Sequence, residues 1–187
     1  RRHREAFREQ EGFSLTYLPF ISRAVIDALR DFPHVNASVG DGELVVHNYV
    51  NVGVAVAAPD ALIVPTVFDA DLKGLRQIST ETKALASRVR DGSITPPELS
   101  GATFTVSNLG MYGISNFQAV INTPQAGILS VGELKAKPVV ADDGSIEARQ
   151  MMGVTLACDH RILYGADGAV FLRRVRALLE EPIALAL

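Results

Sequence analysis

The chain has 187 residues, of which 48% are hydrophobic and 21% charged, the profile of an ordinary globular domain. Its net charge of −3 argues against a general nucleic-acid-binding surface, and no apolar stretch approaches the roughly 20 residues of a membrane-spanning helix. The single cysteine, Cys158, excludes an internal disulfide and a cysteine-rich zinc site. We therefore expect one domain, residues 1–187, in a reducing compartment, with a charged N-terminus that is no signal peptide.

In the first half of the chain, helical and strand patterns alternate. Apolar residues at helical spacing predict a helix from Thr16 to Asp31, which Pro33 ends. Asp41-Gly42 predicts a hairpin. In the next predicted strand Val50, Val52, Val54 and Val56 share one face, and the small residues Gly53, Ala55 and Ala57 hold the other. That face suits either a packed helix or the close approach of a ligand, and "ALIVP" (61–65) is expected to be a second, buried strand.

In the second half of the chain, two further helices and three strands are expected. The helices are Gly74–Arg90 and Ala166–Glu180, the latter with its apolar face formed by Ala169, Leu172, Val175 and Leu179. The predicted strands are "ATFTVSN" (102–108), "AGILSVGEL" (126–134) and "MMGVTLACDH" (151–160), with a hairpin at Asp143-Gly144. Strands, hairpins and helices together predict an α/β (α+β) domain with a mixed sheet, because hairpins argue against an all-parallel sheet.

His160, at the end of the last predicted strand, is the best candidate for catalysis. Histidine transfers protons well near neutral pH, and a strand end holds a side chain rigidly. A lone histidine in a turn is more often structural, so the residue type alone leaves both interpretations open. The sequence contains no phosphate-binding glycine loop, no zinc-protease motif and no serine-hydrolase elbow. The four histidines show no spacing typical of metal ligands, so no metal site is predicted.

Two segments resemble the catalytic domain of the dihydrolipoamide acyltransferases, the acyl-transferring cores of the 2-oxo acid dehydrogenase complexes. That family carries F-T-[IV]-S-N-[LI]-G at a strand end and D-H-R-x-x-D-G further on. Residues 104–110, "FTVSNLG", match the first motif, and Asp159, His160, Arg161 and Gly165 match most of the second. "NVGVAVAAPDALIVPTVFDADLKGL" (51–75) also follows the family's order, so the resemblance covers nearly the whole chain.

The resemblance implies a reaction and roles for individual residues. An acyl group passes between a dihydrolipoyl arm, carried on a separate domain, and coenzyme A, with no metal. His160 is expected to act as the general base on the attacking thiol, and Ser107 to donate a hydrogen bond to the oxyanion. Asn108, Gly110, Asn116 and Phe117 are expected either to line the substrate channel or to shape the turn.

The resemblance also implies a fold and partners. Family members are homotrimers built like chloramphenicol acetyltransferase, with each active site between two subunits, and the trimers assemble into cubic or dodecahedral cores. The partners implied are a lipoyl domain, the 2-oxo acid decarboxylase and dihydrolipoamide dehydrogenase. The first part of the catalytic domain and the lipoyl and peripheral-subunit-binding domains are expected outside this chain. A bacterial cytoplasm is the expected compartment, with mitochondrial matrix and plastid as alternatives.

One position departs from the family pattern. Where the family places Asp or sometimes Asn, this chain has Tyr164, which offers a hydroxyl but no negative charge and is expected to support the catalytic site. The loop "GMYGISNFQAVINTPQAGIL" is closer to acetyl-transferring members than to branched-chain ones, so acetyl is the expected acyl group, with branched-chain acyl open. A catalytically weak structural core, or a free-standing enzyme like chloramphenicol acetyltransferase, is the alternative.

Overall fold

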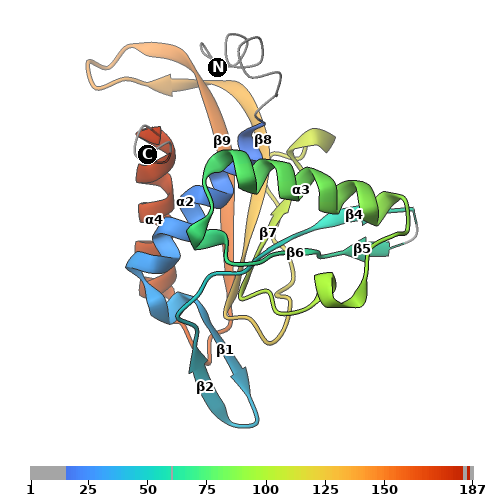
Figure 1. Ribbon diagram of the computed structural model, residues 1–187. Helices are drawn as coiled ribbons and strands as arrows, with labels where there is room; N and C mark the ends of the chain where they lie inside the picture. Colours follow the sequence, from blue (N-terminus) through green and yellow to red (C-terminus); the bar gives the residue numbers. More distant parts are fainter. Residues whose placement is uncertain (1–15, 60, 183–184, 186–187) are drawn as a thin grey trace.

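The structure is a computed structural model that describes residues 16–59, 61–182 and 185. Five strands form its central sheet, in the order β6-β3-β7-β8-β9 (Figure 1). Their bounds in that order are Thr66–Val67, Val52–Val54, Phe104–Asn108, Gly127–Val140 and Ile146–Cys158. β3, β7 and β8 run parallel to one another, whereas β6 and β9 pair antiparallel at the two edges. The predicted mixed sheet is confirmed.

Three α-helices of the described residues lie in front of the sheet in the view of Figure 1: α2 (Tyr17–Asp31), α3 (Leu75–Arg90) and α4 (Gly165–Glu180). Each matches its predicted helix to within one residue at either end. Short 3₁₀ turns connect the elements within the described residues: η1 (Pro33–Val35), η2 (Ala70–Leu72), η3 (Pro96–Leu99) and η4 (Gly110–Tyr112). No helix among the described residues is long and apolar enough to cross a membrane.

The buried face of α4 differs from the predicted one. The structure buries Gly168, Phe171, Val175 and Leu178, whereas Ala169 is exposed and Leu172 and Leu179 are half-buried. Gly168 decides this orientation, because a Cβ there would lie 3.1 Å from the Sγ of Cys158 on β9. The helix therefore meets the sheet through its glycine, and the ring of Phe171 packs 5.7 Å from that of Phe104 on β7.

Two small hairpins flank the central sheet. β1 (Ala37–Gly40) and β2 (Glu43–Val46) turn at Asp41-Gly42, as predicted, and both turn residues have positive φ. The predicted valine strand is in fact divided at residue 55 into β3 and β4 (Val56–Ala58). The prediction of a second buried strand is wrong, because β5 (Ala61–Ile63) pairs only with β4 and Leu62 is 68% exposed.

Gly53, the residue of the small-residue face that lies on β3, serves packing. A Cβ on Gly53 would lie 2.9 Å from Thr105 Oγ1 and 2.9 Å from a methyl carbon of Val64. Neither contact leaves room for a side chain at this position, nor for a ligand between the strands. Of the two roles considered for this face, the structure favours close packing of protein against protein.

β8 and β9 form the longest hairpin, which turns at the predicted Asp143-Gly144 and extends past the rest of the sheet (Figure 1). Their pairing continues from Gly127 opposite Cys158 to Val140 opposite Ile146. β9 thus delivers its C-terminal end, and with it His160, to the opposite end of the molecule from the hairpin tip.

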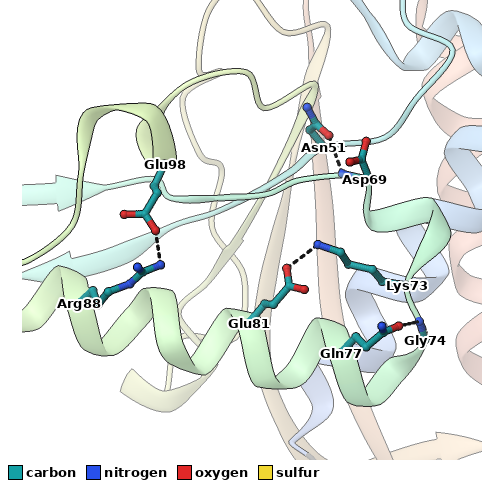
Figure 2. A network of polar contacts seen from close by, with 8 residues as sticks. All are labelled: Asn51, Asp69, Lys73, Gly74, Gln77, Glu81, Arg88 and Glu98. Carbon is teal, nitrogen blue, oxygen red and sulfur yellow. Dashed lines mark hydrogen bonds and ion pairs between the residues drawn. The ribbon is translucent and has the colours of Figure 1, made fainter.

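A network of polar contacts links α3 with the loops at the β3–β6 edge of the sheet (Figure 2). Asn51 is buried, and its side chain accepts the N–H of Asp69 at 2.8 Å and donates to the carbonyl of Gly101 at 2.8 Å. Lys73 pairs with Glu81 at 2.6 Å, Arg88 pairs with Glu98, and the N–H of Gly74 donates to Gln77 at 3.1 Å. These contacts fix loops and helix ends, and none involves a candidate site residue.

Candidate active site

His160 lies in a tight turn directly after β9, where backbone hydrogen bonds fix its position. The N–H of Asp159 donates to the carbonyl of Ala126 at 2.8 Å, which ties the turn to the start of β8. The carbonyl of Asp159 accepts the N–H groups of Ile162 and Leu163 at 2.9 and 3.0 Å. His160 is exposed at the outer side of this turn, and the predicted strand-end presentation is confirmed.

An ion pair braces the same turn. The carboxylate of Asp159 accepts the backbone N–H of Arg161 at 3.0 Å and two guanidinium N–H groups at distances down to 2.6 Å. These hydrogen bonds from Arg161 lower the pKa of Asp159 to about 2. The carboxylate is therefore charged at physiological pH and accepts hydrogen bonds from Arg161.

His160 opens onto a cavity of about 310 Å³ between the end of β9 and the start of α4. The ring of Tyr164 stands edge-on to the imidazole, with the ring centroids 5.4 Å apart. Leu163 forms the floor and is fully buried, and Gln118 reaches the cavity from the loop before β8. Of the residues predicted from the sequence, the structure thus brings His160 and Tyr164 together.

Cys158 also lines this cavity but is unsuited to act as a nucleophile. Burial and the nearby carboxylate of Asp167 raise the pKa of its thiol. Only the thiolate is strongly nucleophilic, so this cysteine remains protonated and inert near neutral pH. The carboxylate of Asp167 accepts the backbone N–H of Tyr164 at 3.0 Å. It caps α4 in this way, so it is not free to stand in for the Asp or Asn expected at position 164.

Ser107 occupies a different environment, on β7 near its C-terminal end. It is 8% exposed, and its Oγ makes no hydrogen bond to another described residue. The hydroxyls on either side are engaged, since Thr105 donates to Gln125 at 2.7 Å and Ser130 accepts the N–H of Ala119 at 3.0 Å. The Ser107 proton is therefore available for donation to a bound group.

Within one chain Ser107 and His160 lie far apart. Ser107 is in register with Ser130 on β8, which is in register with Thr155 on β9. Two strand spacings place Thr155 about 10 Å to the side of Ser107, and the three further residues of β9 to Cys158 add roughly 10 Å along the strand before the turn that carries His160. A group that contacts both side chains in a single chain would have to bridge this separation.

The four predicted channel residues have different surroundings. The side chain of Asn108 accepts the N–H of Gly110 at 2.8 Å, and a Cβ on Gly110 would lie 2.7 Å from the carbonyl oxygen of Gly132. Both residues therefore shape the turn after β7. Asn116 lies over Gly153 on β9, where a Cβ would meet its Oδ1 at 2.0 Å, and Phe117 is half-buried. Substrate contact by any of the four stays a prediction.

Sequence reasoning missed Gln118, because nothing in a lone glutamine between loop residues marks it as a neighbour of His160.

A larger groove, of about 720 Å³, lies between β9 and α4 and is lined by Met152, Val154 and Leu172 among others. It holds neither His160 nor Ser107, so volume alone does not mark the site. Over the described residues, no group of three or more histidine, cysteine or acidic side chains is arranged to hold a metal ion.

Curated relatives of known name match nearly the whole chain. A branched-chain lipoamide acyltransferase component from Bacillus subtilis is 39% identical over 95% of this chain. A succinyltransferase component of the 2-oxoglutarate dehydrogenase complex from Rickettsia bellii is 40% identical over 100% of it, and an acetyltransferase component of the pyruvate dehydrogenase complex from the same organism is 39% identical over 98%. The chain spans 42–46% of the length of these three relatives.

Solved structures of the same kind share the fold. The Azotobacter vinelandii dihydrolipoamide acetyltransferase superposes with a TM-score of 0.92 and 34% identity, over 98% of this chain and 77% of that one. It was studied for the role of a serine, a histidine and an asparagine in its catalytic mechanism, and its asparagine follows its histidine by four residues, as Tyr164 follows His160. The cubic core of a pyruvate dehydrogenase multienzyme complex gives the same values.

A chloramphenicol acetyltransferase superposes with a TM-score of 0.59 at 11% identity, over 94% of this chain and 82% of that one, which shows the fold alone. The family model for the 2-oxoacid dehydrogenases acyltransferase (catalytic domain) matches residues 1–187. This chain therefore belongs to the 2-oxo acid dehydrogenase acyltransferase family and has the chloramphenicol acetyltransferase-like fold expected from its sequence.

Proposed function

We propose that this protein moves an acyl group between a dihydrolipoyl arm and coenzyme A, as the core component of a 2-oxo acid dehydrogenase complex. The observation that carries the proposal is His160, held by a braced turn at the mouth of a cavity, in a chain that matches the acyltransferase family throughout. Ser107, with a free hydroxyl on β7, supplies the second group that acyl transfer to a thiol requires.

His160 acts as the general base in this mechanism. A free thiol has a pKa of about 8.5, so most of it is protonated at neutral pH and reacts slowly. The imidazole removes the proton as the sulfur attacks the thioester carbonyl, and a tetrahedral oxyanion forms. Cys158, the one thiol of the cavity, stays protonated and out of the reaction. The incoming sulfur therefore attacks directly, and no acyl-enzyme is formed.

Ser107 donates a hydrogen bond to the oxyanion. The tetrahedral species then collapses, the carbon–sulfur bond to the leaving thiol breaks, and the protonated His160 returns its proton to that sulfur. Because the proton passes from one thiol to the other, both substrates are bound at the same time. Because Ser107 and His160 of the same chain lie too far apart to act on one substrate, we place the reacting centre between the histidine of one subunit and the serine of another.

The assembly proposed is a homotrimer that builds a larger cubic or dodecahedral core. A solved relative forms a cubic core, and the site of this chain is incomplete within one subunit. A lipoyl domain, a 2-oxo acid decarboxylase and dihydrolipoamide dehydrogenase are the proposed partners. A bacterial cytoplasm is the proposed compartment, with mitochondrial matrix or plastid as alternatives that cell fractionation distinguishes.

Acetyl is the acyl group proposed, on the similarity of residues 110–129 to acetyl-transferring members, and branched-chain acyl is the alternative. The curated relatives do not decide between them, because acetyl, succinyl and branched-chain components match at 39–40% identity. Transfer rates across a panel of acetyl-, succinyl- and isobutyryl-coenzyme A donors to free dihydrolipoamide settle the choice.

The reaction is tested with His160→Ala and Ser107→Ala. We expect His160→Ala to remove nearly all transfer and Ser107→Ala to lower turnover by roughly 100- to 1,000-fold, the loss typical of one oxyanion donor. His34→Ala, which replaces an exposed histidine outside the cavity, is the matched control and keeps full activity. Turnover that survives in His160→Ala would show that this histidine is not the base.

A catalytically weak structural core is the second candidate, and the observation that favours it is Tyr164. The tyrosine carries no carboxylate, and Asp167, three residues on, is committed to the cap of α4. Light scattering combined with the same transfer assay separates the two functions. Large particles without detectable transfer support the structural core.

A further inference from the structure

Ser130, on β8, lies beside Ser107 in the central sheet. The two residues are register partners on the parallel strands β7 and β8. Register partners on neighbouring strands place their side chains on the same face of the sheet, with the backbones about 4.8 Å apart. Ser130 is 1% exposed and Ser107 is 8% exposed. The two hydroxyl groups therefore share one face of the sheet and are both largely removed from solvent.

The oxygen of Ser130 is held from one side. It accepts the backbone N–H of Ala119 at 3.0 Å, and Ala119 belongs to the segment of residues 114–122 between η4 and β8. This segment is itself tied to β8, because the N–H of Glu133 donates to the carbonyl of Ile114 at 2.8 Å. The N–H of Ala119 occupies one lone pair of the Ser130 oxygen and leaves its proton unused. That proton has no acceptor among the described residues.

Two hydroxyl groups flank Ser130, and burial favours Ser107 as the acceptor of its proton. Thr155 on β9 is the register partner of Ser130 on the other side. Thr155 is half-buried, so its hydroxyl can bond to water. Ser107 is nearly enclosed, and its Oγ has no hydrogen bond to another described residue. Because buried hydroxyl groups are normally hydrogen-bonded, Ser107 is the neighbour that needs a partner from the protein.

Side-chain rotation alone can join the two serines. No hydrogen bond between Ser107 and Ser130 is present in the described structure. With the backbones about 4.8 Å apart, rotamers that turn both hydroxyl groups toward each other bring the two oxygens to roughly 3 Å. Hydrogen bonds that serve catalysis are often long in an unliganded enzyme and shorten when the substrate is bound.

We propose that Ser130 is a positioning residue, whose hydroxyl donates to Ser107 Oγ and aims the proton of Ser107 at the oxyanion. A serine hydroxyl has one proton and two lone pairs. When a lone pair of Ser107 accepts the proton of Ser130, the O–H of Ser107 points away from β8, toward a bound group. The amide of Ala119 and the two hydroxyl groups then form a chain in which each hydrogen bond strengthens the next. This inference rests on the proposed function, because it needs Ser107 as the oxyanion donor.

A double-mutant cycle on the assembled protein tests the proposal. We expect Ser130→Ala to lower kcat for acyl transfer by about 3- to 10-fold, the contribution of one neutral hydrogen bond, with KM unchanged for both substrates. In a Ser107→Ala background the same substitution is expected to have no effect, because the residue that Ser130 positions is missing. An equal loss in both backgrounds would show that Ser130 acts through packing or through Ala119, and would overturn the proposal. An unchanged kcat in Ser130→Ala would overturn it as well.

Two further variants separate the hydroxyl of Ser130 from the packing around it. Ser130→Thr keeps an oxygen for Ala119 and a proton for Ser107, so it should retain most of the turnover. A Ser130→Thr variant that assembles but is as slow as Ser130→Ala contradicts the proposal. Ser22→Ala is the matched control, because it removes a hydroxyl that is also 1% exposed but lies on α2, outside the His160 cavity, and it should keep full activity. If Ser130→Thr does not assemble, the cycle built on Ser130→Ala still decides.

The failure of this inference differs from the failure of the proposed function. A wild type that transfers acyl groups, loses activity in Ser107→Ala and is unaffected by Ser130→Ala upholds the function and overturns the role of Ser130. A wild type that transfers no acyl group overturns both, because the role of Ser130 depends on the reaction.

Discussion

At the scale of single residues, Tyr164 stands four residues after His160, where the Azotobacter vinelandii relative has an asparagine four residues after its histidine. Its ring stands edge-on to His160, 5.4 Å between centroids, and the residue is 66% exposed in the isolated chain. The ring flanks the imidazole, while its hydroxyl makes no hydrogen bond to another described residue. The contact visible in the structure is thus between two rings, which a carboxylate could not make.

We therefore expect Tyr164→Phe to keep most of the activity, with a loss of about 1 kcal/mol or less in transition-state stabilisation, less than tenfold in kcat/KM. Tyr164→Ala removes the ring and leaves His160 less constrained, so a larger fall in kcat is expected. Steady-state transfer kinetics on both variants measure the difference. A Tyr164→Phe loss as large as that of His160→Ala would show that the hydroxyl takes part in the chemistry.

At the scale of elements, local patterns predicted most helices and hairpins but not the environment of every strand. The Asp41-Gly42 and Asp143-Gly144 turns were predictable because each contains a glycine, which accepts the positive φ found at Gly42 and Gly144. The exposure of Leu62 was not, because an apolar run of five residues does not tell whether a strand joins the central sheet. His160 and Tyr164 were predictable through motif spacing, whereas the neighbourhood of Gln118 depends on the path of an unpaired loop.

The path of the loop that contains Gln118 depends on glycines in β8 and β9. We expect Gly132→Ala to destabilise the protein by about 1–3 kcal/mol, because the new methyl group would overlap the backbone carbonyl of Ser115, which cannot rotate away. Thermal or denaturant unfolding of the variant measures the loss. Gly165→Ala is the matched control: a Cβ there meets nothing within 4 Å, so that variant should be at least as stable as the wild type. An unchanged midpoint for Gly132→Ala would show that the segment can lift from the sheet without cost.

At the scale of the whole molecule, the sheet register keeps Ser107 and His160 apart within one chain, which is why the proposed site is shared between subunits. Ser107 and His160 come from strands on either side of β8, and the distance between them is set by pairing that one chain cannot alter. The sequence motifs identify both residues, but they do not tell whether the two residues of one site come from the same chain or from two different chains. That information comes from register, which is a consequence of long-range pairing.

Mixed assemblies of two inactive variants test this directly. When His160→Ala and Ser107→Ala chains are co-expressed in equal amounts, a site with both groups intact needs the histidine of one variant and the serine of the other. Random assembly of a ring forms such sites about a quarter of the time, so roughly a quarter of wild-type transfer should return. Sites built within one chain would return none, because every chain then lacks one group. Co-expression of the wild type with a chain carrying both substitutions is the control: shared sites again give about a quarter of full activity, whereas sites within one chain give about half.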